Sequence, residues 1–105
     1  MRTKRKICPT HPGILLREDV LPAMGLSVAK AADHLSVSRA YLYRVLEGRV
    51  PMSMEMCIKV GKLAGNGPEL WVNMQAAHDL WKAENSPSLQ KAVKKVPSYR
   101  ELTVA

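Results

Sequence analysis

The sequence predicts an all-α fold of five helices, with a helix-turn-helix formed by the second and third of them. Apolar residues recur at helical spacing in five successive segments. Clusters of Gly, Pro, Asn and Ser separate these segments, as is typical of short loops. The hydrophobic fraction is 47% without any Phe, so Leu, Val, Ala and Met must build the core. A chain of 105 residues with this composition suits one small helical domain with tails.

The predicted domain spans residues 11–85, between a flexible basic arm at residues 1–10 and a C-terminal tail at residues 86–105. The arm has no helical periodicity, and it contains Arg2, Lys4, Arg5 and Lys6. Such a segment either lies along phosphates or a groove, or is simply a solvated tail. In the C-terminal tail, one short amphipathic helix is indicated by Leu89, Ala92, Val93 and Val96. Pro97 should end it, and residues 98–105 are expected to be disordered or extended.

The first helix of the domain is expected within residues 11–24. Pro12 is acceptable at a helix start, where its missing N–H has no partner to lose. Pro22 and Gly25 are both predicted to stop the helix.

The stretch from Ser27 to Gly48 predicts two short helices joined by a tight corner. Apolar residues recur with the spacing i, i+3, i+4 and i+7 at Val28, Ala31, Ala32 and Leu35. The pattern breaks at residues 36–38 and resumes with Leu42, Val45 and Leu46. Ser38 is well placed as the N-cap of the second helix, and Gly48 as the residue after its C-cap. Small and apolar residues at these positions fit a helix-turn-helix, whose two helices cross closely.

The predicted outer face of the second helix has a composition that suits DNA. Its members are Arg39, Ala40, Tyr41, Tyr43, Arg44 and Glu47. Arg can reach guanine edges or phosphates, Tyr can donate to phosphate, and Ala can touch a thymine methyl group. The alternative is a surface helix with incidental charges, and the helix taken alone does not decide between the two.

The fourth helix is predicted at residues 54–64 and the fifth at residues 68–84. Ser53 can cap the fourth, and Cys57 within it is expected to be a small core residue. The fifth has a broad apolar surface, which usually has two burial partners. One is the domain core, and the other could be a second subunit, since two-fold homodimers are the commonest oligomers. The predicted dimer contacts are Trp71, Met74 and Trp81, and the tail after Pro87 is a further candidate for the dimer contact.

The net charge of +7 is concentrated in the half with the helix-turn-helix. Residues 1–50 contain nine Lys/Arg against four Asp/Glu, whereas residues 51–105 contain seven against five. This asymmetry favours a polyanionic partner, although basic proteins without nucleic-acid ligands are common. Two cysteines suggest reduced thiols, and the sequence contains no apolar run long enough for a membrane span and no secretion signal. A cytoplasmic protein is therefore expected.

Enzyme and metal functions find little support in the sequence. There is no Gly-rich phosphate loop and no supported nucleophile–histidine arrangement. Cys8 and His11 have a C-x2-H spacing, but no second close pair completes the four ligands of a structural zinc site. We expect no catalytic residues, no metal and no cofactor. The aromatic residues could be imagined as a stacking platform for single strands, but the helical spacing of Trp71 and Trp81 is more typical of packing.

Three stretches resemble the HigA-type antitoxins, also called the VapI family, within the lambda-repressor-like (XRE) group. They are HPGILLREDVLPAMGLS, VSRAYLYRVLEGR and PELWVNMQAAHDLWKAE, and they cover roughly residues 11–84. The resemblance implies a five-helix lambda-repressor-like domain with its helix-turn-helix at helices two and three. It also implies a homodimer that represses its own operon by binding a palindromic operator. The same family binds and neutralises a HigB toxin, a RelE-like ribosome-dependent mRNA endonuclease.

Three positions depart from the family pattern. Ser36 stands at the corner where Gly is usual, and such corners often need a positive φ. Val28 stands where many relatives have a phosphate-clamping Gln, so that contact must be lost or moved to Ser27 or to a helix N-terminus. Gly61 stands where Ala is usual, and a close helix crossing would explain it.

These observations predict a sequence-specific, DNA-binding antitoxin that acts on double-stranded operator DNA. The predicted DNA-binding residues are Ser27, Ser38, Arg39, Ala40, Tyr41, Tyr43, Arg44 and Arg49. Arg39 and Ala40 are expected nearest the base edges, because the N-terminal residues of a recognition helix enter the groove most deeply. One alternative is a stand-alone repressor without a toxin. Another is a protein-interaction bundle whose helix-turn-helix has lost DNA binding.

Overall fold

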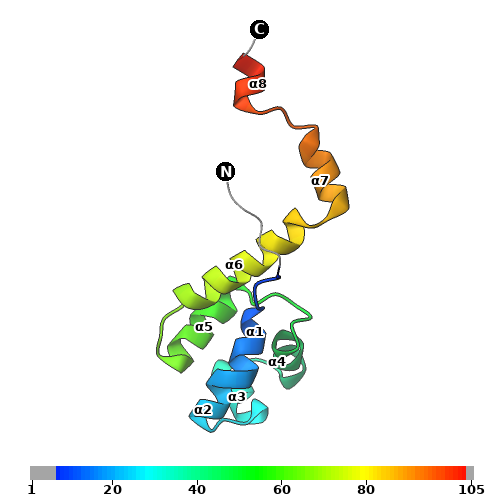
Figure 1. Ribbon diagram of the computed structural model, residues 1–105. Coiled ribbons are helices and arrows are strands. Elements are labelled where there is room, and N and C mark those ends of the chain that lie inside the picture. Colours follow the sequence, from blue (N-terminus) through cyan, green and yellow to red (C-terminus); the bar gives the residue numbers. More distant parts are fainter. Residues whose placement is uncertain (1–6, 104–105) are drawn as a thin grey trace.

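The computed structural model describes residues 7–103, which contain no strand and are helical apart from residues 7–11 and the connections between helices. The elements in order are α1 (Pro12–Leu15), a π-helical turn η1 (Leu16–Val20), α2 (Leu21–Met24), α3 (Val28–Leu35), α4 (Arg39–Leu46), α5 (Met54–Ala64), α6 (Glu69–Glu84), α7 (Pro87–Lys94) and α8 (Tyr99–Thr103). Helices α1 to α6 gather into a body, and α7 and α8 extend from one end of it (Figure 1). The all-α prediction is confirmed, while Arg2, Lys4, Arg5 and Lys6 of the predicted arm lie outside the described residues.

The first helical segment runs from Pro12 to Met24 without a break, so the prediction that Pro22 stops it is wrong. The π-helical turn η1 widens the helix, and the N–H of Leu21 donates to the carbonyl of Leu16, five residues back. Pro22 comes next, in the first turn of α2, where its missing N–H and its ring are tolerated beside the wider turn. Gly25, in the left-handed conformation at φ 65°, ends the segment as predicted.

The corner between α3 and α4 has the compact geometry that the helix-turn-helix prediction requires. Ser36 adopts φ 56° and ψ 45°, the left-handed conformation in which Gly is normally favoured. The N–H of Val37 donates to the carbonyl of Ala32 at 3.1 Å and so closes the turn. Val37 then packs against the core. The expected positive φ at this corner is confirmed, and a serine carries it.

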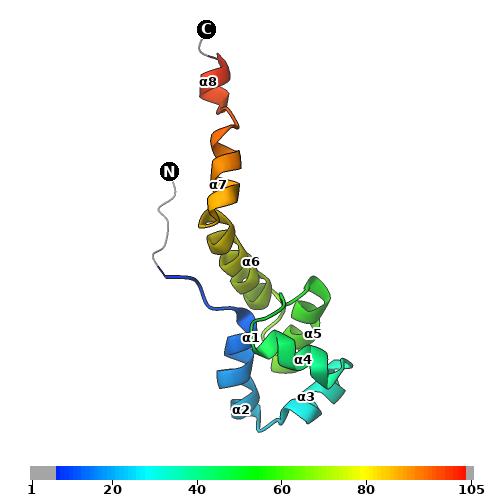
Figure 2. The ribbon, with the colours of Figure 1, turned by 90° about the vertical axis from the view of Figure 1, so that its right-hand side faces the viewer.

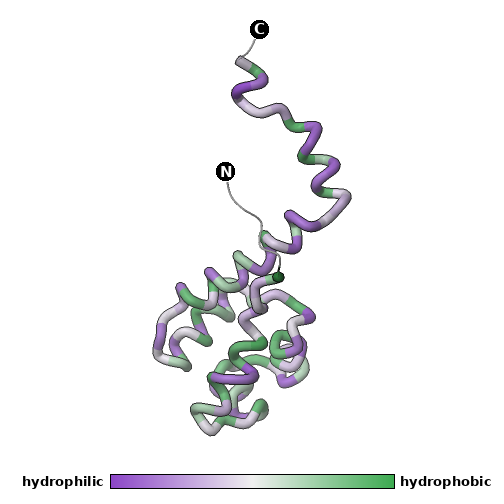
Figure 3. The backbone as a smooth tube through the Cα atoms, in the orientation of Figure 1, coloured by the Kyte–Doolittle hydropathy of each residue, from purple (hydrophilic) through white to green (hydrophobic). Residues whose placement is uncertain are grey.

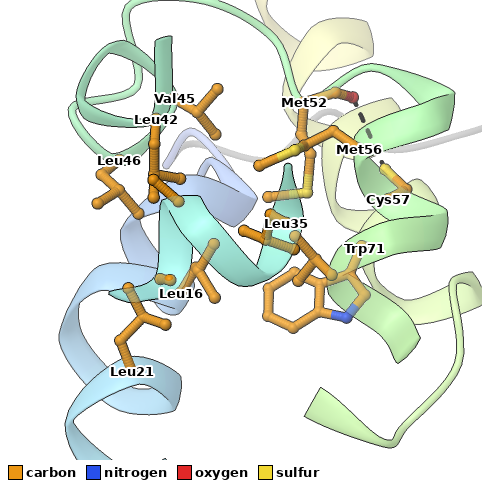
Figure 4. Close-up of a cluster of buried hydrophobic side chains, with 13 residues drawn as sticks. Leu16, Leu21, Leu35, Leu42, Val45, Leu46, Met52, Met56, Cys57 and Trp71 are labelled. Carbon is orange, nitrogen blue, oxygen red and sulfur yellow. Dashed lines mark hydrogen bonds between the residues drawn. The ribbon is translucent and has the colours of Figure 1, made fainter. Parts of the chain in front are cut away.

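The core of the body joins all of its helices (Figure 4). Its largest fully buried side chains include Trp71, Leu16, Leu42, Leu46 and Met56. Cys57 is buried among them as predicted, and burial raises the pKa of its thiol. The Cys57 Sγ donates a weak hydrogen bond to the carbonyl of Met52 at 3.7 Å.

Gly61 lies where the backbone of the α5–α6 loop approaches α5. A Cβ built on Gly61 would lie 2.3 Å from the carbonyl carbon of Gly67 and 2.6 Å from the nitrogen of Pro68. The Gly61 carbonyl also accepts hydrogen bonds from the N–H groups of Gly65 and Gly67. The glycine is therefore explained by a close approach, but by that of a loop rather than by the expected helix crossing.

The C-terminal arm, residues 87–103, leaves the body at the end of α6. Figure 2 shows α7 and α8 succeeding one another away from the helix-turn-helix, and the molecule measures 62 Å along its longest axis against 24 Å across. Hydrophobic and hydrophilic residues alternate along the arm (Figure 3). The predicted helix after residue 86 is present as α7. The expectation of a disordered or extended segment after it is wrong for residues 99–103, which form α8 because Ser98 caps that turn through its Oγ and the Glu101 N–H at 3.1 Å.

Candidate nucleic-acid interface

The candidate interface is built on α4, whose start is fixed by a serine cap. The Ser38 Oγ accepts a hydrogen bond from the Tyr41 N–H at 3.1 Å, and Ser27 caps α3 in the same way through the Lys30 N–H at 3.2 Å. Each serine oxygen is thus used as an acceptor, and its O–H remains able to donate. Both hydroxyl groups are on exposed residues. The two caps can therefore donate to phosphate oxygens without releasing their helices.

The exposed face of α4 holds most of the predicted reading residues. Arg39, Ala40 and Arg44 are exposed, and Tyr43 is 50% exposed. On the opposite face, Leu42, Val45 and Leu46 are at most 1% exposed, so core packing fixes the rotation of the helix about its axis.

Tyr41 differs from its prediction, because its side chain is half-buried and packs against the core. It does not point away from the apolar stripe with the two arginines. The ring therefore helps to hold α4 in place, and its phenol is the part left to reach DNA.

Arg49 lies just after α4 in an exposed ion pair. Its Nε is 2.8 Å from the Glu47 Oε2, and the Arg49 side chain is 72% exposed. An exposed pair of this kind contributes little to stability, on the order of 1 kcal/mol or less. The guanidinium can therefore exchange Glu47 for a phosphate.

Two residues that sequence reasoning missed position α4 against the first helix. A Cβ on Gly13 would lie 1.9 Å from the carbonyl oxygen of Val45, so α1 and α4 touch backbone to backbone at this point. His11 caps α1, with its Nδ1 accepting from the Gly13 N–H at 2.9 Å. The His11 Nε2 lies 2.9 Å from the carbonyl of Val50, in the loop after α4. The signal in the sequence is the His-Pro-Gly run, which indicates a helix start but not this second role.

The two contacts of His11 specify its neutral form. Nδ1 must offer a lone pair to Gly13, and Nε2 must carry the proton that is donated to Val50. Burial lowers the pKa of His11 below its ordinary value, with the neighbouring His78 and Lys82 adding to the lowering, while the Val50 hydrogen bond and Asp79 oppose it. Geometry and desolvation therefore agree that the ring is neutral near pH 7.

The same loop is tied to α6 by a buried glutamine that the sequence pattern did not single out. Gln75 Oε1 accepts from the Met52 N–H at 2.7 Å, and its Nε2 donates to the Asp79 Oδ1 at 2.8 Å. The chain leaving α4 is thus held from α1 by His11 and from α6 by Gln75.

The predicted dimer residues divide into two groups. Trp71 is wrong as a surface contact, because it is fully buried in its own body, where its Nε1 donates to the Asn66 Oδ1 at 3.1 Å. Met74 and Trp81 are half-buried and lie on the stripe of α6 that also contains Leu70, which is 43% exposed. This stripe, and not the buried tryptophan, is the surface that α6 offers to another molecule.

Cys8 and His11 do not share a site. The Cys8 Sγ lies 3.5 Å from the Nδ1 of His78, and that Nδ1 donates to the carbonyl of Pro9 at 2.8 Å. The His11 and His78 rings meet edge to face at 5.2 Å. Among residues 7–103, no three His, Cys, Asp or Glu side chains are grouped so as to hold a metal ion. The same part of the chain has no helix with the length and apolar character needed to cross a membrane.

Comparison with known proteins places this arrangement in a family. No protein-family model matches the chain. It is 37% identical over 81 residues to virulence-associated protein A' of Dichelobacter nodosus, covering 76% of this chain and 70% of that one. It is 33% identical over 84 residues to antitoxin HigA-1 of Vibrio cholerae, covering 80% and 77%. Among solved structures, antitoxin GraA in complex with its operator aligns with a TM-score of 0.79 at 31% identity, covering 92% and 97%. The chain therefore belongs to the HigA family of helix-turn-helix antitoxins.

Proposed function

We propose that the protein binds operator DNA as a homodimer, represses its own operon and neutralises a toxin made from the same operon. The observation that carries the DNA-binding part is the exposed, basic face of α4, which is held rigidly by buried residues on its other side. The similarity to an antitoxin solved with its operator supports the same role. The protein acts without catalysis, and it acts where the DNA is, in the cytoplasm.

On this proposal, Arg39 and Ala40 contact base edges because they lie in the first turn of α4. Tyr43 reaches a base or a phosphate one turn further along. Phosphates are bound by Ser27, Ser38, Arg44 and Arg49, with Tyr41 adding its phenol. Val28 packs against the core, so the phosphate contact that the family resemblance implies for a glutamine at this position passes to the Ser27 hydroxyl and the N-terminus of α3.

The test of base contact is Arg39→Ala, measured by fluorescence anisotropy on the protein's own promoter and on a scrambled duplex. Loss of a bidentate guanine contact should weaken promoter binding by roughly 1–3 kcal/mol and narrow the gap between the two duplexes. Arg17→Ala removes the same charge from η1, outside the helix-turn-helix, and serves as the matched control. If Arg39→Ala prefers the promoter over the scrambled duplex as strongly as the wild type does, Arg39 is not one of the residues that contact the bases. If the wild type shows no salt-dependent affinity for DNA, the alternative that remains is a protein-interaction bundle that has lost DNA binding.

The dimer is proposed to form through the α6 stripe, with Met74 and Trp81 in the contact. Sedimentation equilibrium at micromolar concentration should give twice the mass of 11.7 kDa. Met74→Glu should lower the mass to that of one chain while leaving the helical circular dichroism intact. A monomeric mass for the wild type would reject the proposed dimer.

The toxin part of the proposal rests on the family alone. The test is to express the reading frame beside this gene, with and without this protein, and to monitor growth and messenger cleavage. Growth arrest that this protein relieves would support neutralisation. If promoter binding is intact but no neighbouring frame is toxic, the protein is a stand-alone repressor.

A further inference from the structure

The C-terminal arm exposes its apolar side chains and buries none of its residues. The exposed fractions are 56% for Val93, 67% for Val96, 82% for Tyr99 and 69% for Leu102. Helices of eight and five residues are too short to be stable on their own in water. The two helices of the arm therefore need another surface to bury their apolar residues if they are to be stable.

The charge of the arm restricts what that surface can be. The arm contains four basic residues, Lys91, Lys94, Lys95 and Arg100, and one acidic residue, Glu101. A complementary surface has an apolar floor and an acidic edge.

The body offers such a surface along α6 and the first helical segment. A groove of about 860 Å³ is lined by Leu70, Asn73, Met74 and Ala77 of α6 together with residues 7–10. It shares Thr10 and Met74 with a hollow of about 320 Å³ whose edge is formed by Glu18 and Asp19.

The acidic edge of this groove is available for a new partner. Glu18 pairs with Arg17 at 2.8 Å, and both side chains are largely exposed. Asp19 has no ion pair with any of the residues 7–103. The floor and edge of the groove thus match the apolar face and the positive charge of the arm.

The arm of the same chain points away from this groove. In both ribbon views α7 and α8 continue beyond the C-terminal end of α6 (Figures 1 and 2). The groove lies along the other half of α6, beside Leu70, Asn73, Met74 and Ala77. An arm that fills the groove must therefore come from a second chain.

We propose that two copies of the chain exchange their C-terminal arms, each arm lying in the α6 groove of the other protomer. The proposal rests on the homodimer proposed above and specifies how it closes. If two α6 helices pack antiparallel and cross near Trp81, a residue n positions after 81 lies opposite the residue n positions before 81. The arm that follows Glu84 is then directed toward the first half of α6 in the other protomer, where Leu70, Asn73, Met74 and Ala77 line the groove. A two-fold axis repeats the contact, so both arms and both grooves are covered.

The first test uses the wild-type protein. Equal amounts of ¹⁴N- and ¹⁵N-labelled protein are mixed, equilibrated and treated with a zero-length carbodiimide, which joins a carboxylate to an amine as an amide with loss of water. Arm exchange predicts amide cross-links between Glu18 or Asp19 of one chain and a lysine within residues 91–95 of the other chain. Some of these cross-links should join a ¹⁴N peptide to a ¹⁵N peptide, because they connect two different chains. The proposal would be overturned if every cross-link between these two segments joined peptides of the same isotope, or if the dimer gave no cross-link between them.

The second test is a charge exchange measured by sedimentation equilibrium. Lys95→Glu and Asp19→Lys should each raise the dimer Kd by about fivefold, and the double variant should recover most of the loss. Lys62→Glu, the same change on the exposed face of α5, should leave the Kd unchanged. Val93→Glu should raise it by at least about tenfold, because it places a charge in the apolar contact.

The outcomes separate this proposal from the proposed dimer. A wild type that is monomeric at micromolar concentration rejects both. A dimer that Met74→Glu dissociates, but that the arm variants leave unchanged, keeps the α6 interface and rejects the exchange. The arm exchange is also rejected if both single charge variants weaken the dimer and the double variant does not restore the dimer Kd.

Discussion

The body and the C-terminal arm use the same local device to start their helices, yet only the helices of the body bury their apolar residues. Ser38 and Ser53 cap α4 and α5 in the body, and Ser86 and Ser98 cap α7 and α8 in the arm. Helices α4 and α5 bury several apolar residues each, whereas α7 and α8 bury none. Capping therefore determines where a helix starts, and burial determines whether the chain holds it without a partner.

The comparison predicts its largest effect for Trp71→Ala in the body. Trp71 is fully buried, and removing its indole leaves a cavity, so the free energy of unfolding should fall by about 3–5 kcal/mol. Leu89→Ala in the arm, where Leu89 is 44% exposed in the single chain, should change the free energy of unfolding of the monomer by about 0.5 kcal/mol or less. Urea denaturation at a protein concentration below the dimer Kd measures both variants as monomers, because dimer dissociation makes apparent stability depend on concentration. Equal losses in the two variants would mean that the arm is part of the cooperative core.

A smaller loss is expected from Gly13→Ala, and it should extend to DNA binding. The added Cβ would meet the Val45 carbonyl, so α4 must shift from α1, which costs roughly 1–3 kcal/mol of stability. Promoter affinity should fall as well, because the shifted helix is the reading helix. Gly25→Ala is the control: its Cβ meets nothing within 4 Å, but its φ of 65° makes it strained by about 1 kcal/mol. Promoter affinity unchanged in Gly13→Ala would show that the α1–α4 contact does not set the position of α4.

The same distinction explains what the sequence could predict. Bounds are best predicted where cap and burial agree: the helix expected at residues 54–64 lies at Met54–Ala64, between Ser53 and Gly65. Pro22 is misleading because a π-helical turn, which depends on hydrogen bonds five residues apart, absorbs it. The α8 helix escapes prediction because its apolar residues have no periodic partner in so short a segment.

Site residues obey the same rule. The exposed face of α4 could be predicted because its opposite face shows a clear apolar stripe, and Tyr41 alone departs from the predicted face because it packs against the core. The predicted dimer contact of Trp71 is wrong because helical spacing shows that a surface is apolar without showing which body covers it. Gln75 and His11 could not be identified as positioning residues, since their partners, Met52 and Val50, are more than twenty positions away in the sequence.

A smaller change in stability, confined to the body, is expected when a decrease in pH protonates His11. Its pKa is lowered in the folded protein from the ordinary value of 6.5, so below pH 6.5 the unfolded chain binds the proton more readily than the folded one. Stability should be fully present above pH 6.5 and fall as the pH decreases through the folded-state pKa. His78, Asp79 and Lys82 face the same ring, and Cys8 contacts His78. Thermal unfolding of wild type and His11→Asn between pH 5 and 7.5 measures the effect.

Asparagine at position 11 can still cap α1 but does not titrate. His11→Asn should therefore show a weaker decrease in stability on acidification than the wild type does. An identical pH dependence in the two proteins would assign the decrease to the other groups around the ring.

The smallest effect is expected at the corner of the helix-turn-helix, and its sign is opposite to the others. Ser36→Gly relieves the strain of a left-handed residue with a Cβ, roughly 1–2 kcal/mol. Glycine also gives the unfolded chain more freedom, which offsets about 0.4–1 kcal/mol of that gain. The net expectation is a stabilisation of about 0.5–1 kcal/mol, measured by urea denaturation.

Ser36→Ala separates strain from the hydroxyl group. Alanine keeps the Cβ and the strain, so its stability should stay near that of the wild type, whereas a loss would indicate that the Ser36 hydroxyl supports the turn. A gain in Ser36→Gly without a change in promoter affinity would mean that the strained corner already holds α4 in the geometry that glycine would allow. A gain in both stability and promoter affinity would mean that Ser36 limits how closely the helix pair α3–α4 can approach the DNA. Either result concerns the body alone, because the N–H groups of the corner donate only to carbonyls of α3.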